Sequence, residues 1–202
     1  MPEKGDCGGG RNVRPTVNIV LCGLGGQGIL FMTKVLAQAG LDRGFNVMGA
    51  ETHGMAQRGG SVVSHLRFGD VAGSLVRTHS AQFLLALEEN EAYRNLPFLM
   101  EGGTMVANAD SGRFPVDNVR VYLGKKQITC HSVSAEAIAQ ELGAPLSSNL
   151  ALLGFFSGFD DALFSHSELR ATITKISPER VREKNLRIFD AGLEKAIKEK
   201  GA

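Results

Sequence analysis

The chain has 202 residues, of which 43% are hydrophobic and 21% are charged, and its formal net charge is +1. This length accommodates one sizeable core, and the composition is that of an ordinary globular domain. A net charge so close to zero argues against nucleic acid or an anionic membrane surface as the main partner.

The first fifteen residues differ in composition from the rest of the chain. Residues 1–15 are glycine-rich and polar, which predicts a flexible leader ahead of a single domain at 16–202. The leader lacks the apolar segment of a secretory signal, and no run of about 18 apolar residues follows, so we expect a cytoplasmic protein without a membrane span. Cys7, Cys22 and Cys130 are far apart and lack metal-ligand spacing, which predicts neither a metal site nor an iron–sulfur cluster in this chain.

Hydrophobic patterns predict alternating strands and helices. Short apolar runs indicate strands at 16–22, 45–50, 61–68, 81–87, 103–108, 119–123 and 128–131, with 71–77 as a hairpin partner of the strand at 61–68. Helical spacing, glycine stops and capping residues indicate helices at 29–43, 88–96 and 134–143. Three further helices are expected, one after a cap at Asn149, one after the capping pair Ser165 and Glu168, and one after Pro178. This order predicts an α/β fold, namely a single Rossmann-like three-layer domain with a mixed, mostly parallel sheet and helices on both faces.

The sequence GLGGQG at residues 23–28 separates the first strand from the first helix. Gly23, Gly25 and Gly28 match G-x-G-x-x-G, which lets backbone amides approach a phosphate at a helix N-terminus. Glu51 lies where a dinucleotide fold places its ribose-binding carboxylate. A dinucleotide, another phosphate ligand and a packing turn without ligand all remain open.

A second loop, ETHGMAQRGG at residues 51–60, carries two candidate functional side chains. Arg58 lies between Gln57 and a glycine pair, so its planar guanidinium can reach a carboxylate or phosphate, or form an ion pair between subunits. His53 can donate to a substrate or transfer a proton, or lie in solvent or at an interface.

Taken together, GLGGQG and ETHGMAQRGGSVVSHLRFG closely resemble the gamma-type domain of the pyruvate and 2-oxoacid:ferredoxin oxidoreductases, in particular its indolepyruvate type. The resemblance continues through LPFLMEGGTMVANAD, NLALLGFFSGF and NLRIFDAG. It therefore covers nearly all of the chain after the leader.

The resemblance implies a subunit that does not itself bind thiamine. Its enzyme would convert aryl 2-oxoacids and coenzyme A to arylacetyl-CoA, with electrons passed to ferredoxin. A large alpha subunit would carry thiamine diphosphate, magnesium and the iron–sulfur clusters, and the present chain would be inactive alone. In agreement, the chain has no GDG sequence followed by asparagine, the pattern of a thiamine diphosphate site, and no cysteine cluster.

Coenzyme A is the cofactor that the resemblance places at or near this chain. The residues expected to bind it are Gly23, Gly25, Gly26, Gln27, Gly28, Gln57 and Arg58, with His53 and Arg58 as catalytic candidates. Contact of the glycine turn with the partner surface is the alternative. Three other functions stay open: a gamma subunit acting on pyruvate, 2-oxoglutarate, a branched-chain or an arylglyoxylic acid; an autonomous NAD(P)- or flavin-binding protein; and an interaction module without a ligand.

Overall fold

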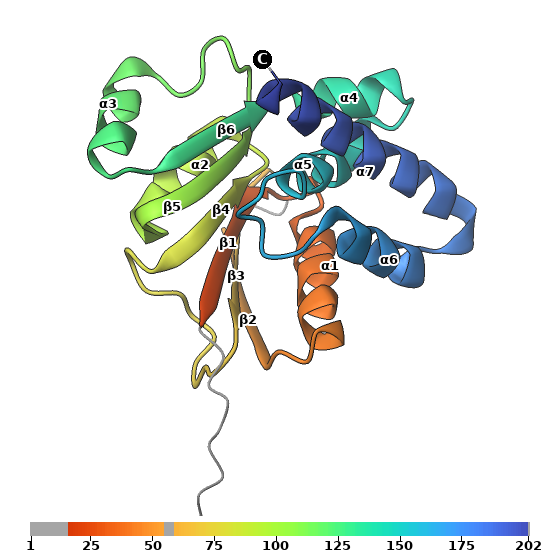
Figure 1. The fold of residues 1–202 in the computed structure, drawn as a ribbon, viewed down its shortest axis with the longest axis horizontal. Helices are drawn as coiled ribbons and strands as arrows, with labels where there is room; N and C mark the ends of the chain where they lie inside the picture. Colours follow the sequence, from red (N-terminus) through yellow and green to blue (C-terminus); the bar gives the residue numbers. More distant parts are fainter. Residues whose placement is uncertain (1–15, 55–58, 202) are drawn as a thin grey trace, which may run out of the picture.

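A computed structural model describes residues 16–54 and 59–201. Six strands form one sheet in the order β2-β3-β1-β4-β5-β6 (Figure 1). Their bounds are Val17–Leu24 for β1, Val47–His53 for β2, Ser61–Phe68 for β3, Ala81–Ala86 for β4, Leu99–Asn108 for β5 and Thr129–Val133 for β6. Because only β3 runs against its neighbours, the predicted mixed, mostly parallel sheet is confirmed.

Helices cover both faces of this sheet (Figure 1). They are α1 (Ile29–Asp42), α2 (Glu89–Asn95), α3 (Asp117–Lys125), α4 (Ala135–Glu141), α5 (Ser148–Phe156), α6 (His166–Ile176) and α7 (Glu179–Lys200), with 3-10 turns at Leu96–Phe98 and Pro145–Ser147. One core lies between the sheet and α1 with α4 to α7, and a second lies between the sheet and α2 with α3. The predicted three-layer architecture is therefore confirmed.

Strand β1 is buried on both faces because it lies in the middle of the sheet. Ile19 and Leu21 enter the first core, whereas Val20 and Cys22 enter the second. Burial raises the pKa of the Cys22 thiol, as expected for a small hydrophobic core residue. The helix after β1 covers one face and the helix after β4 the other, so the topological switch point lies between the carboxyl ends of these two strands.

The hairpin partner expected at 71–77 is wrong, because these residues form no strand. Both edges of β3 are already paired, with β2 on one side and β1 on the other. Residues 71–77 therefore have no free edge of β3 to join.

The strand expected at 119–123 is also wrong, because these residues belong to α3. β5 and β6 are parallel neighbours, so the chain must cross over between their ends, and a helix makes such a connection. Of the α3 residues only Leu123 is buried, so alternating valines here do not indicate a buried strand.

The second strand starts and ends later than expected. β2 runs to His53 and pairs with β3 rather than with β1, so it does not complete an adjacent βαβ unit with β1. Residues 51–53, expected in the second glycine loop, therefore belong to an edge strand, which places Glu51 and His53 on a regular backbone.

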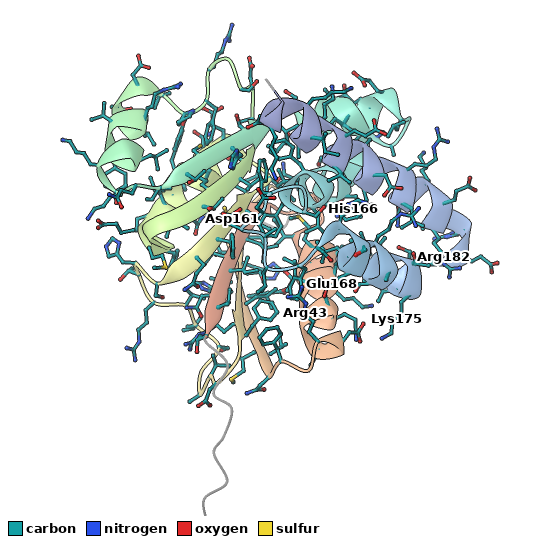
Figure 2. The ribbon with its side chains drawn as sticks, viewed as in Figure 1. Arg43, Asp161, His166, Glu168, Lys175 and Arg182 are labelled. Carbon is teal, nitrogen blue, oxygen red and sulfur yellow. The ribbon has the colours of Figure 1, made fainter. Side chains whose placement is uncertain are left out.

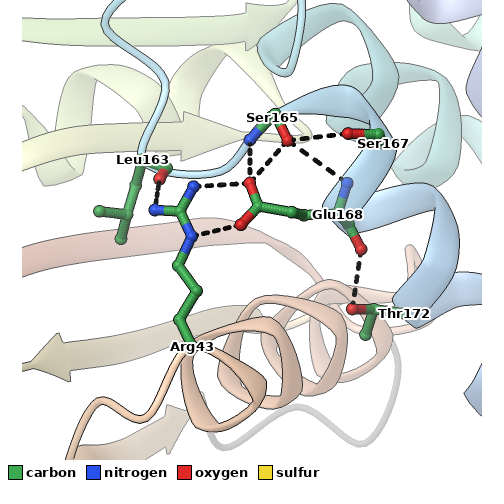
Figure 3. Close-up of polar contacts among 6 residues, drawn as sticks. All are labelled: Arg43, Leu163, Ser165, Ser167, Glu168 and Thr172. Atoms are coloured by element: carbon green, nitrogen blue, oxygen red, sulfur yellow. Dashed lines mark hydrogen bonds and ion pairs between the residues drawn. The ribbon is translucent and has the colours of Figure 1, made fainter.

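The predicted capping box is confirmed and forms part of a clamp between α1 and α6. Ser165 accepts from the backbone of Glu168, and the Glu168 side chain accepts from the backbone of Ser165. The same carboxylate forms a two-point ion pair with the Arg43 guanidinium, which also donates to Leu163 O at 2.6 Å (Figure 3). Figure 2 shows that the Arg43 and Glu168 side chains lie near one another, beside α1 and α6. The clamp therefore joins the end of α1 to the start of α6.

The clamp predicts a pH-dependent contribution to stability. Hydrogen bonding from Arg43 lowers the pKa of Glu168 to about 2, whereas the pKa of an unfolded-chain glutamate is about 4.3. The contribution is therefore complete above the unfolded pKa and is lost as the pH falls toward 2. Since both side chains are 36% exposed, Glu168→Gln should lower the free energy of unfolding by only about 1 kcal/mol at pH 7.

Urea unfolding from pH 7 down to pH 3 measures this difference, which should stay constant to about pH 5 and shrink below the unfolded pKa of about 4.3. Glutamine can keep the capping box, so the variant tests the charge. The control is Glu101→Gln, which removes an exposed pair with Lys126 at 3.5 Å and should change stability by a few tenths of a kcal/mol at most. A difference for Glu168→Gln that does not vary with pH would contradict the prediction.

Candidate functional site

The two glycine loops meet at the topological switch point. The N–H of Gly25 donates to Gly60 O at 2.9 Å, and Leu24 pairs with Ser61 at the end of the β1–β3 ladder. The N–H of Gly54 donates to Ser61 O at 2.7 Å and closes the base of the second loop. Two segments that sequence reasoning joined only through the resemblance are therefore in direct contact.

The turn after β1 needs glycine at two positions for different reasons. Gly26 has φ of 101°, and a Cβ built there meets no atom of the described residues within 4 Å. Gly28 has φ of 86°, and a Cβ there would lie 2.4 Å from Asn149 Nδ2. Among the described residues, a side chain would have space at Gly26, whereas at Gly28 it would collide with Asn149 of α5.

Asn149 does not cap a helix, so that expectation is wrong. It lies inside α5, which begins at Ser148, and its Nδ2 donates to Gly28 O at 3.2 Å. The buried amide thereby fixes the residue that precedes α1. The phenylalanines at 155, 156 and 159 are buried and belong to the first core.

The start of α1 has the electrostatics of an anion site. The first N–H groups of a helix have no partner within the helix and carry the positive end of its dipole. The first turn of α1 contains no acidic side chain that would compete for them. A phosphate group placed here would be stabilised by both effects.

A cavity of about 520 Å³ opens beside this helix start. Among the described residues its lining is mostly apolar, with one titratable side chain, and comprises Leu24, Gly25, Gly26, Gly28, Ile29, Leu30, His53 and Val62. His53 Nε2 lies 3.6 Å from a carboxylate oxygen of Glu51, and the histidine side chain is 55% exposed. The structure thus brings His53 and the predicted glycines Gly25, Gly26 and Gly28 around one space.

Gln27 faces the interior of the turn. Its Oε1 accepts from Leu24 N at 2.7 Å, and its Nε2 donates to Leu87 O at 3.3 Å. Gly23 lies under the same side chain, because a Cβ there would be 2.7 Å from Gln27 Oε1. Gln27 therefore braces the turn across to the strand end of β4.

We expect Gln27→Ala to lower the free energy of unfolding by about 1 to 2 kcal/mol, because it removes the side-chain acceptor of the partly buried Leu24 N–H and one of the two amide donors to Leu87 O, the other being Asn108 Nδ2. Chemical denaturation measures the change. Gln38→Ala is the matched control, since Gln38 Nε2 donates to the exposed Asp42 carboxylate at 2.8 Å, and losing this bond should lower the free energy of unfolding by a few tenths of a kcal/mol. Equal losses in the two variants would show that Gln27 is not a brace.

Two predicted site residues, Gln57 and Arg58, lie outside the described residues. Within the described segments, histidine, cysteine, aspartate and glutamate side chains do not gather in groups of three or more that could hold a metal ion. No helix in those segments has both the length and the apolar character needed to cross a bilayer.

The Rossmann-like sheet, with two glycine loops in contact at its switch point, places the chain in the class of α/β domains with helices on both faces of the sheet. Within that class, residues 18–195 match the family described as pyruvate ferredoxin/flavodoxin oxidoreductase, and the chain belongs to this family.

Proteins similar in sequence to this chain include subunits of one particular type of oxidoreductase in this family. The indolepyruvate oxidoreductase subunit IorB of Archaeoglobus fulgidus is 33% identical over 192 residues, covering 90% of this chain and 96% of the relative. IorB of Thermococcus kodakarensis is 34% identical over 199 residues, with the same two coverages of 90% and 96%. Among solved structures, the chain resembles 2-oxoglutarate:ferredoxin oxidoreductase from Magnetococcus marinus, described with 2-oxoglutarate, coenzyme A and succinyl-CoA bound. The TM-score is 0.73 at 20% identity, over 92% of this chain and 32% of that one. The last similarity supports the fold.

Proposed function

We propose that this chain is the non-thiamine-bearing subunit of an indolepyruvate:ferredoxin oxidoreductase. The enzyme would oxidatively decarboxylate aryl 2-oxoacids with coenzyme A and pass the electrons to ferredoxin. The observation that carries this proposal is the joined pair of glycine loops beside an open cavity, in a chain of this family. Relatives named for indolepyruvate support the choice of substrate class.

Coenzyme A is the proposed occupant of the cavity. Its pyrophosphate would lie at the start of α1, where Gly26 leaves room for the backbone to approach. The apolar side chains of Leu24, Ile29 and Val62 suit an uncharged portion of the same ligand. His53 and Arg58 remain the proposed catalytic candidates, with Gln57 and Arg58 also proposed for binding.

Thiamine diphosphate, magnesium and iron–sulfur clusters are proposed to lie in a large alpha subunit. When bound there, thiamine diphosphate supplies the carbanion chemistry of decarboxylation. The present chain's part is to orient coenzyme A and to exclude water at the subunit boundary. Its three cysteines, far apart in sequence, support placing the clusters elsewhere.

Co-purification with a candidate alpha subunit tests the proposal. The pair should reduce a viologen dye only when an aryl pyruvate and coenzyme A are both present, and each chain alone should be inactive. Pyruvate, 2-oxoglutarate and branched-chain oxoacids, assayed in parallel, test the substrate class. NAD(P)H-dependent activity or tight NAD(P)H binding by the lone chain would overturn the proposal.

A further inference from the structure

A carboxylate is buried beneath the point where the two glycine loops meet. Glu91, in α2, is 1% exposed, and among the described residues no other aspartate or glutamate is buried. Removing a carboxylate from water costs several kcal/mol unless charges or hydrogen bonds compensate. The contacts of Glu91 therefore indicate what this carboxylate does.

Both oxygens of the Glu91 side chain accept short hydrogen bonds. Oε2 accepts from Ser61 Oγ at 2.6 Å, and Oε1 accepts from Arg94 at 2.6 Å. The Arg94 side chain is 69% exposed, whereas Ser61 belongs to the loop junction. The backbone of Glu91 is fixed as well, because its N–H donates to Glu88 at 2.9 Å and its carbonyl accepts from Cys22 Sγ at 3.4 Å.

Ser61 connects the Glu91 side chain to both glycine loops through backbone hydrogen bonds. Its carbonyl accepts from Gly54 N at 2.7 Å, and the preceding carbonyl, of Gly60, accepts from Gly25 N at 2.9 Å. A Cβ on Gly54 would lie 3.2 Å from Ser61 N, so the second loop closes tightly on this residue. A displacement of Ser61 would therefore shift Gly60 relative to the first loop.

We propose that Glu91 is a positioning residue that acts through Ser61 to hold Gly60 against Gly25, and so sets the spacing of the two loops around the coenzyme A pyrophosphate. Glu91 touches no ligand in this arrangement. The ligand named here rests on the proposed function, whereas the spacing of the loops does not. The buried carboxyl group, with a short hydrogen bond on each oxygen, gives a fixed geometry that a contact between loop backbones alone would not supply.

Kinetics of the complete complex provide the first test. Ser61→Ala should raise KM for coenzyme A about fivefold to tenfold and leave kcat within twofold. Ser61→Thr, which keeps the hydroxyl, should restore most of the affinity. Ser80→Ala is the matched control, because Ser80 Oγ donates to Arg77 O at 2.7 Å just before β4, away from the loops, and its KM should equal that of the wild type.

A double-mutant cycle tests whether Glu91 acts through Ser61. Glu91→Gln keeps an acceptor but loses the charge, so it should raise KM for coenzyme A about threefold. Adding it to Ser61→Ala should have little further effect, because the two residues share one interaction. Independent, multiplicative effects on KM would overturn the proposed route.

Amide exchange supplies a readout that does not depend on the substrate. In Ser61→Ala the N–H of Gly25 should exchange several times faster, measured by mass spectrometry on a peptide that covers 23–28 in the complex. Unchanged exchange at Gly25, or an unchanged KM in an active complex, overturns the positioning role and leaves the proposed function standing. A wild-type complex that does not use coenzyme A overturns the proposed function, while faster exchange in Ser61→Ala would still support the role of Glu91.

Discussion

Replacing Gly154 with alanine is expected to lower the free energy of unfolding by about 3 kcal/mol or more, the largest stability effect that we predict for a single methyl group. A Cβ at Gly154 in α5 would lie 1.9 Å from Phe189 O and 2.8 Å from Phe189 C in α7. Both atoms belong to the backbone, so no side-chain rotation can relieve the clash. Helices α5 and α7 would have to separate.

A glycine in α7 shows the same close approach of α5 and α7. A Cβ at Gly192 in α7 would lie 2.1 Å from Ala151 O in α5. The interface is thus a backbone-to-backbone approach, in which packing density leaves no space for an added carbon. Separation of the helices would loosen Phe155 and Phe189, which are both nearly fully buried.

Gly124→Ala is the matched control for Gly154→Ala and should have the opposite sign. Gly124 lies in α3, where a Cβ meets nothing within 4 Å. Alanine there should stabilise by roughly 0.5 to 1 kcal/mol, because it restricts the unfolded chain and favours the helix. Denaturant unfolding of both variants measures the contrast, and a small loss in Gly154→Ala would contradict the close approach of α5 and α7.

Local signals in the sequence predicted the elements that depend on neighbouring residues. The strand, glycine turn and helix at 17–42 follow from hydrophobic period and from glycine, and the capping box of Ser165 and Glu168 follows from its spacing. Strand neighbours are a non-local property. The pairing of β2 with β3, and the lack of a free edge for 71–77, depend on contacts that a local pattern does not encode.

The same contrast between local signals and non-local contacts applies to the residues of the candidate site. Gly25 and Gly28 belong to a sequence motif and Gly26 lies within it, so the sequence predicted them, whereas Asn149 and Glu91 act through contacts 121 and 30 residues away along the chain. Asn149 did leave a signal, since it is a lone amide in an otherwise apolar helical segment. Glu91 left none, because an acidic residue in the first turn of a helix is already accounted for by the helix dipole.

Replacing Gly26 with aspartate is expected to raise KM for coenzyme A at least about fivefold more than replacing it with asparagine. The two variants add side chains of the same size at a position with φ of 101°, where a Cβ meets no atom of residues 16–54 and 59–201 within 4 Å. Aspartate and asparagine tolerate positive φ to a similar degree, so the backbone cost should cancel between them. Only the charge differs.

The magnitude follows from the distance between charges. A carboxylate a few ångströms from a bound pyrophosphate, in a partly exposed cavity, would oppose binding by about 1 to 3 kcal/mol, which corresponds to roughly a fivefold to hundredfold change in affinity. Added salt should narrow the gap between the two variants, because the repulsion crosses a solvent-accessible site. KM for the 2-oxoacid should respond equally to both.

The pair of Gly26 variants also separates the two proposed occupants of the turn. If the turn binds a partner surface instead of coenzyme A, both variants should weaken assembly of the complex, and KM for coenzyme A should not depend on the charge. Size-exclusion chromatography and steady-state kinetics on the same preparations distinguish these results. Equal KM values for coenzyme A would remove the turn from the proposed binding site and leave membership of the family unaffected, because that rests on residues 18–195 as a whole.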